Sequence, residues 1–204
     1  MCGLFALSAK TKSVEKLLPK VKIPDDLKPR ITIAPAQDIA VVLNDGNDEV
    51  TFVKWGLIPF WSKDTTIGKK MFNARAETIL EKPSFKNLMK NKRCAILSDG
   101  FYEWQKLEGN PKKIRHLIKM KSKEPFAFAG LWDTWTDKTT GESITSAVII
   151  TTEPNELIAQ IHDRMPVILP PDKINIWLEQ GDSNIPELLS FLKPYPPEEM
   201  EILS

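Results

Sequence analysis

The stretch Cys94-Ala-Ile-Leu-Ser-Asp-Gly-Phe-Tyr-Glu-Trp104 contains two short apolar runs separated by Ser-Asp-Gly. The first run is Cys94–Leu97 and the second is Phe101–Trp104. Runs of about four to eight residues rich in β-branched and aromatic side chains are typical of strands, whereas helices need longer periodic segments. The sequence therefore predicts two successive strands here.

The same pattern recurs on both sides of this stretch. Asn44-Asp45-Gly46 lies between two apolar runs, and Asp-Gly in that position is a strong signal for a hairpin turn. The further expected strands are Gly3–Leu7, Ile39–Leu43, Val50–Trp55, His116–Met120, Phe126–Trp132 and Ile144–Thr151.

Expected helices are fewer, short and placed mainly beside the runs of strands. They are Ser13–Leu18, Ser84–Lys90, Asn155–Ile161, Pro171–Gln180 and Pro186–Leu192. Strands and helices do not alternate strictly, which favours an α+β fold over a parallel α/β fold. We expect a single domain over residues 1–204, built on a mostly antiparallel, barrel-like β-sheet decorated by these short helices.

Length and composition exclude several protein classes. The chain has 204 residues, enough for one substantial core. No apolar run approaches the roughly 18–20 residues that cross a bilayer, and no basic region precedes the short apolar stretch at the start, so no signal peptide is expected. Two cysteines and two histidines are too few for a disulfide framework or a structural zinc site.

Charge is unevenly distributed along the chain. The net charge is +1, but residues 51–123 hold 17 basic against 6 acidic side chains, and residues 124–204 hold 4 against 14. The basic third can form a positive face for a polyanion such as nucleic acid. Alternatively, its lysines and arginines are ordinary solvated residues that pair with the acidic third.

Cys2 becomes the terminal residue if the initiator Met1 is removed. Its α-amine then has a reference pKa of about 7.7–8.0 and its thiol one of about 8.5, so both are usable nucleophiles near neutral pH. An aldehyde can form an imine with the amine, and the thiol can close a five-membered thiazolidine. The plain alternative is a small apolar residue beginning an edge strand. Met-Cys-Gly also begins amidotransferase glutaminase domains, but their His-Arg-Gly-Pro and Asn-Gly-Glu segments are missing.

Seven segments in the same order resemble the SOS response-associated peptidase (SRAP) family. They are the initial Met-Cys-Gly, Ile33-Ala-Pro-Ala-Gln37, Lys54-Trp-Gly-Leu-Ile-Pro59, Phe72-Asn-Ala-Arg-Ala-Glu-Thr78, Ser98-Asp-Gly-Phe-Tyr-Glu-Trp104, Ala129-Gly-Leu-Trp132 and Ile161-His-Asp-Arg-Met-Pro166. The resemblance implies an α+β domain that shields abasic sites in single-stranded DNA by cross-linking to them. It also implies a proteolytic activity that exposes the terminal cysteine.

The resemblance implies four catalytic residues. Cys2 is the cross-linking nucleophile, His162 donates a proton to open the sugar ring, and Asn73 positions the amine or sugar. Glu103 transfers protons. Strand alternation sends Glu103 to the same face as Phe101, where burial among aromatic side chains should raise the pKa of its carboxyl group.

It also implies four DNA-binding residues, Arg75, Arg164, Trp61 and Pro35. Guanidinium groups bind phosphates through paired hydrogen bonds, and aromatic rings stack on bases without sequence preference. We expect Trp55, Trp104, Trp132 and Trp135 to belong to the core instead.

Some positions depart from the family pattern. Leu4 stands where many members have Arg, Thr32 stands where Asn is frequent, and Ser62 follows Trp61 where a second tryptophan can occur. These differences bear on DNA contact, not on the cross-linking residues. Members commonly continue by one more short segment beyond the equivalent of Ser204, so we expect either a shorter member or a chain lacking that segment.

Three functions follow as hypotheses. The first is a DNA-damage response protein of the SOS and repair type, a self-modifying enzyme that cross-links to abasic sites through Cys2 and has peptidase and lyase activity. The second is a thiol peptidase using Cys2 and His162, and the third is a noncovalent single-strand binder. We expect no metal or organic cofactor, single-stranded DNA and replication proteins as partners, a monomer without membrane contact, and a cytoplasmic, nucleoid-associated location.

Overall fold

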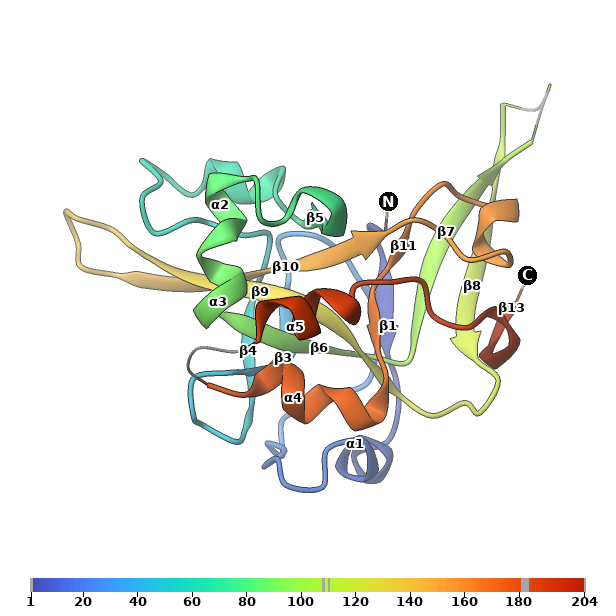
Figure 1. Ribbon diagram of the computed structural model, residues 1–204, viewed down its shortest axis with the longest axis horizontal. Coiled ribbons are helices and arrows are strands. Elements are labelled where there is room, and N and C mark those ends of the chain that lie inside the picture. Colours follow the sequence, from blue (N-terminus) through green and yellow to red (C-terminus); the bar gives the residue numbers. More distant parts are fainter. Residues whose placement is uncertain (1, 108, 110, 181–183, 204) are drawn as a thin grey trace.

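The protein was analysed as a computed structural model, which describes residues 2–107, 109, 111–180 and 184–203 (Figure 1). Its strands are β1 (Phe5–Leu7), β2 (Arg30–Ile33), β3 (Asp38–Leu43), β4 (Val50–Trp55), β5 (Asn73–Arg75), β6 (Arg93–Ser98), β7 (Gly100–Lys106), β8 (Lys113–Met120), β9 (Phe126–Thr136), β10 (Ser143–Thr152), β11 (Met165–Pro166), β12 (Ile168–Leu169) and β13 (Met200–Leu203). Its α-helices are α1 (Thr11–Leu17), α2 (Pro83–Lys86), α3 (Leu88–Asn91), α4 (Ile174–Leu178) and α5 (Ile185–Ser190).

Five strands close into a barrel. They follow the order β10-β4-β3-β6-β9, and β9 pairs back onto β10 to complete the circle. The β10–β4 pair is parallel and the other four pairs are antiparallel, so the barrel is mixed. Closure leaves no free edge between these strands, which satisfies the backbone hydrogen bonds of the most apolar segments.

A second sheet lies beside the barrel, with the order β13-β8-β7-β1-β2 and antiparallel pairing throughout (Figure 1). Phe5 of β1 joins this sheet to the barrel, since its ring packs edge-on against Trp55 at 5.0 Å and Phe128 at 5.7 Å between centroids. Phe101 of β7 also contacts Phe128, at 6.1 Å. These buried aromatic contacts fix the position of the N-terminal strand.

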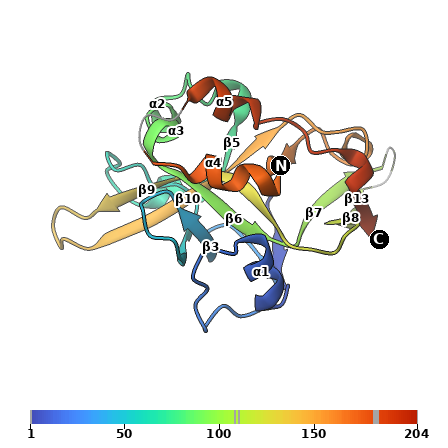
Figure 2. The same ribbon diagram turned by 60° about the horizontal axis from the view of Figure 1, so that its bottom comes forward.

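Short helices cover the barrel from different sides. Trp177 of α4 is fully buried and donates a hydrogen bond of 3.0 Å to the Cys94 carbonyl of β6. Figure 2 shows α1 on the opposite side of the barrel from α2 and α5. No helix in the described parts of the chain is long and apolar enough to span a membrane.

The predicted fold class is confirmed: the protein is a single α+β domain with a mostly antiparallel barrel and short helices. Every expected strand is present, and Gly46 of the β3–β4 turn has a φ of +90°, as the hairpin signal requires. Some expected helices differ. Asn155–Ile161 contains only a 3-10 turn at Ile158–Gln160, Ser84–Lys90 is split into α2 and α3, and Pro171–Gln180 begins as a 3-10 turn before α4.

Candidate active site

Cys2 lies three residues before β1 and is completely buried. Its Sγ is 3.8 Å from the Leu4 carbonyl oxygen, and that same oxygen accepts a hydrogen bond of 2.9 Å from the Tyr102 N–H of β7. Burial, and then the negative charge of Glu103, raise the pKa of the Cys2 thiol far above its usual value. The thiol is therefore protonated at neutral pH.

Asn73 contacts Cys2 from β5, which pairs with the barrel strand β10. Its Nδ2 donates a hydrogen bond of 2.8 Å to the Cys2 carbonyl oxygen. Within the described residues the buried Oδ1 of the same amide has no hydrogen-bond partner. A buried acceptor without a partner costs free energy, so this oxygen is suited to receive an N–H or O–H from a terminal amine or a bound sugar.

Glu103 comes from β7 and lies on the same buried face as Phe101, as alternation predicts. Its carboxyl group is only 2% exposed, and burial raises its pKa to about 7. The predicted direction of this shift is confirmed. A carboxyl group with a pKa near neutrality can both accept and donate a proton under physiological conditions.

His162 faces Glu103 from the turn after Ile158–Gln160, with 3.8 Å between its Nε2 and the Glu103 Oε2. The Arg164 N–H donates a hydrogen bond of 3.0 Å to Nδ1 of the ring, which directs Nε2 toward the carboxyl group. Burial lowers the pKa of His162. Because burial raises the pKa of Glu103 and lowers the pKa of His162, the pair favours a protonated carboxyl group beside a neutral imidazole.

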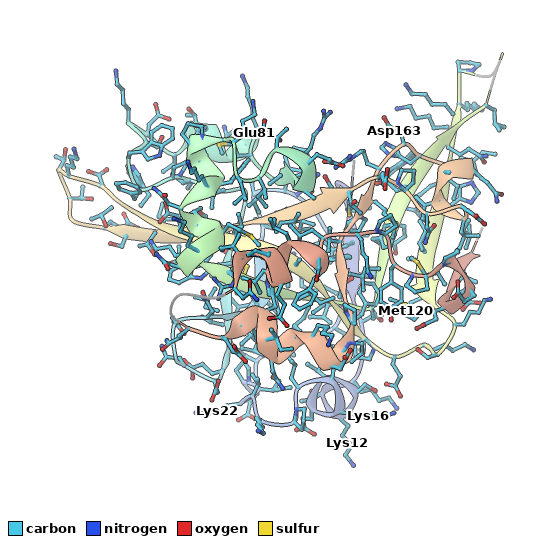
Figure 3. All side chains as sticks on the ribbon, viewed as in Figure 1. Lys12, Lys16, Lys22, Glu81, Met120 and Asp163 are labelled. Atoms are coloured by element: carbon cyan, nitrogen blue, oxygen red, sulfur yellow. The ribbon has the colours of Figure 1, made fainter. Side chains whose placement is uncertain are left out.

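An open pocket of about 420 Å³ gives access to this pair, lined by Glu103, Trp104, Lys106, Lys113, Ile161, His162 and Asp163. Figure 3 labels Asp163 at the upper right of the molecule. A second pocket of about 520 Å³ lies between α1 and residues 195–199 and contains none of the four expected catalytic residues. Chemistry is therefore expected in the first pocket.

The two expected phosphate-binding arginines flank these residues but differ in their surroundings. Arg75 ends β5 and is exposed. Arg164 is mostly buried, and its guanidinium group donates to both Glu77 carboxylate oxygens at 2.6 and 3.0 Å and to the Thr151 carbonyl at 2.8 Å. Arg164 is thus engaged by a carboxylate where a phosphate was expected.

Trp61 lies on the loop 56–62, which is hydrogen-bonded to the barrel strand β9. The backbone N–H of its neighbour Phe60 donates a hydrogen bond to the Asp133 carboxylate, and the Trp135 indole N–H donates to the Ser62 carbonyl, both at 2.8 Å. Trp61 is 52% exposed and Phe60 is 67% exposed. The loop presents two rings to solvent, of which the sequence analysis singled out only Trp61.

Pro35 is half-buried in the turn between β2 and β3, where Ala36 has a φ of +70°. The expectation for the other tryptophans is confirmed only in part. Trp55 and Trp135 are buried, whereas Trp104 and Trp132 are half-buried. Trp104 is one of the residues that line the pocket.

Two functional neighbours were not selected from the sequence. Glu77, inside the segment Phe72–Thr78, holds Arg164, and Thr151 supplies that arginine with a carbonyl acceptor. Glu77 follows Arg75 by two residues, but nothing in the sequence indicates that its partner is Arg164, 87 positions further on. No group of residues typical of a metal site occurs among the described residues.

Residues 1–204 match the family described as SOS response associated peptidase (SRAP). The chain is 44% identical to the abasic site processing protein YoqW of Bacillus subtilis, over 98% of this chain and 90% of that protein. It is 31% identical to the abasic site processing protein HMCES of Rattus norvegicus, over 87% of this chain and 61% of that protein. A crystal structure of a protein from Bacteroides thetaiotaomicron superposes with a TM-score of 0.87 at 34% identity, covering 98% and 90% of the two chains.

Proposed function

Since the chain belongs to the SOS response associated peptidase family, we propose that it processes abasic sites in single-stranded DNA by forming a covalent thiazolidine through Cys2. The relatives named as abasic site processing proteins support the substrate. The observation that carries the proposal is the convergence of Asn73 and Glu103 on Cys2, with His162 beside Glu103. Met1 must be removed first, because both nucleophiles of the reaction belong to a terminal cysteine.

The first step uses the α-amine of Cys2. His162 protonates the ring oxygen of the abasic sugar, which opens the hemiacetal to the aldehyde. The amine attacks the aldehyde carbon, a C–N bond forms, and the carbonyl oxygen leaves as water to give an imine. Asn73 holds the Cys2 backbone during this step, while Glu103 takes and returns protons.

The second step uses the thiol. The sulfur attacks the imine carbon, a C–S bond forms, and the thiol proton passes to the nitrogen. The sum is protein plus aldehyde giving thiazolidine plus one water. A protonated thiol suits this order, since its proton is needed on nitrogen and its raised pKa keeps it from reacting first.

The raised pKa of the Cys2 thiol also distinguishes cross-linking from the alternative function, that of a thiol peptidase. A thiol peptidase depends on a thiolate, and reactive cysteines have a lowered thiol pKa. The pKa of the Cys2 thiol is raised instead. We therefore assign any peptidase activity to removal of Met1, and lyase activity to the imine stage of the main reaction.

Variants of Cys2 test the proposal. The processed protein is incubated with an oligonucleotide carrying one abasic site and analysed on a denaturing gel. We expect wild type to form a stable adduct, and Cys2→Ala and an N-terminally acetylated protein to form none. A stable adduct with either would disprove the thiazolidine, and salt-sensitive binding without any adduct would support the noncovalent alternative.

A further inference from the structure

The β7–β8 hairpin carries a strip of basic residues that the cross-linking chemistry does not use. Alternation places Trp104 and Lys106 on the face opposite to Glu103. The register pairs Trp104 with Arg115 and Lys106 with Lys113 across the two strands. Directly paired residues lie on the same face of a sheet, so Lys106, Lys113 and Arg115 form one strip, which we call the hairpin strip.

The hairpin strip carries an excess of positive charge. Its three basic residues are exposed, and in the described ranges of the chain none of them forms an ion pair. Other lysines are paired: Lys16 with Glu124 at 2.7 Å and Lys92 with Asp133 at 2.6 Å. Arg115 lies over the Tyr102 ring, 5.2 Å from its centroid, which orients the guanidinium group without neutralising it.

The hairpin strip is continuous with the active site. Lys106 and Lys113 line the pocket that contains Glu103 and His162. The charge of Lys106 also reaches the imidazole, since it adds to the lowering of the His162 pKa that burial causes first. Asp163 is the acidic residue on the rim of this pocket and is largely exposed.

The hairpin strip lies on the opposite side of Cys2 from Arg75, one of the two arginines expected to hold phosphates. Cys2 is contacted by Asn73 of β5, and β5 ends at Arg75. The β7–β8 hairpin adjoins β1 from the other direction in the sheet order β8-β7-β1, and Figure 1 shows β5 and β7 on the two sides of β1. A single strand of DNA that passes Arg75 and then Cys2 would therefore continue toward the β7–β8 hairpin.

From these observations we propose that the hairpin strip binds the phosphates of one flank of the single-stranded DNA, beyond the lesion. This inference rests on the proposed function and adds a second DNA subsite to it. Lys106 is three positions after Glu103 along β7, about 10 Å at roughly 3.4 Å per residue. At the roughly 3.4 Å axial spacing of phosphates along one strand of a duplex, that length accommodates two or three phosphates, and fewer in an extended strand.

The test compares a triple variant with a matched control. The variant is Lys106→Gln, Lys113→Gln and Arg115→Gln, and the control is Lys12→Gln, Lys20→Gln and Lys22→Gln, which removes the same charge. Figure 3 labels Lys12 and Lys22 at the opposite end of the molecule from Asp163. All six residues are exposed, so an unchanged melting temperature is expected and confirms folding.

Two oligonucleotides of equal length carry the abasic site near the 5′ end or near the 3′ end, so that only one flank is long. We expect the triple variant to form adduct on the order of tenfold more slowly with one oligonucleotide, and less than about threefold more slowly with the other. The control should change neither rate by more than about twofold. Equal losses with both oligonucleotides, or no loss, would overturn the inference.

Binding to an undamaged strand separates this inference from the proposed function. The slope of log affinity against log salt concentration should flatten by up to about 2 in the triple variant, because at most three phosphate contacts are lost at about 0.7 each. If wild type forms no adduct but the slope flattens in the triple variant, DNA binding by the hairpin strip is supported and the cross-linking proposal is refuted. If adducts form normally and the slope is unchanged, the strip is refuted alone.

Discussion

Among single residues, Glu103 links reactivity to stability. Its carboxyl pKa rises from 4.5 to about 7 on folding, so the folded state holds the proton more tightly than the unfolded state. That stabilisation is fully present below pH 4.5 and is lost as the pH rises through 7. At pH 8.5 the ionised carboxylate costs about 3 kcal/mol of the free energy of unfolding.

Replacing Glu103 by Gln removes this cost together with the proton transfer. We expect Glu103→Gln to gain up to about 3 kcal/mol of unfolding free energy over wild type at pH 8.5 and little at pH 4. Adduct formation should slow by about 10²-fold or more. Denaturant titrations at the two pH values measure the change in stability. If the free energy of unfolding changed with pH in the same way for both proteins, the prediction would be contradicted.

Glu77 occupies the guanidinium group of Arg164, where we propose that a DNA phosphate binds. It is about half exposed and engages the guanidinium group through two hydrogen bonds, so a DNA phosphate must displace it to bind Arg164. We expect Glu77→Gln to bind an undamaged single strand about two- to fivefold more tightly, the range set by a surface ion pair. Fluorescence anisotropy in a Cys2→Ser background measures this, with Glu81→Gln as the control. Weaker binding would mean that Glu77 holds Arg164 in its binding position.

At the scale of elements, Gly56 fixes the loop that presents Phe60 and Trp61. It has a φ of +131°, and a Cβ built there would lie 2.3 Å from the Gly68 carbonyl oxygen. Because that atom is backbone, the clash cannot be relieved by a side chain. We expect Gly56→Ala to lose about 3 kcal/mol or more, against about 1 kcal/mol for Gly141→Ala, which has a φ of +77° and open space. Equal shifts in the denaturation midpoint would refute this account.

The elements also show where sequence reasoning succeeds. Strands β6, β7, β9 and β10 were predicted because their apolar runs are about four to eight residues long and rich in β-branched and aromatic side chains. Strand β13 was missed, since Met200–Leu203 follows a proline-rich stretch and is defined by its pairing with β8. The turn at Ile158–Gln160 was overestimated as a helix, because Asn155 caps it through Ile158 N–H and the chain then turns toward β11.

For the molecule as a whole, the candidate site could be proposed from motifs but not from local patterns. Glu103 and His162 are 59 positions apart, and their contact depends on how β7 packs beside the turn before β11. The Gln105 amide helps to fix that arrangement by donating a hydrogen bond of 2.9 Å to the Gln160 carbonyl. Neither this bond nor the Glu77–Arg164 ion pair leaves a signal in a single sequence, because both join distant segments through side chains.

The central claim is tested most directly by the intact mass of the protein under denaturing conditions, alone and after incubation with a single-stranded oligonucleotide containing one abasic site. We predict a protein that lacks Met1 and an adduct whose mass equals protein plus oligonucleotide less one water. A protein that has lost Met1, so that Cys2 is its N-terminal residue, and that still forms no adduct would contradict the account.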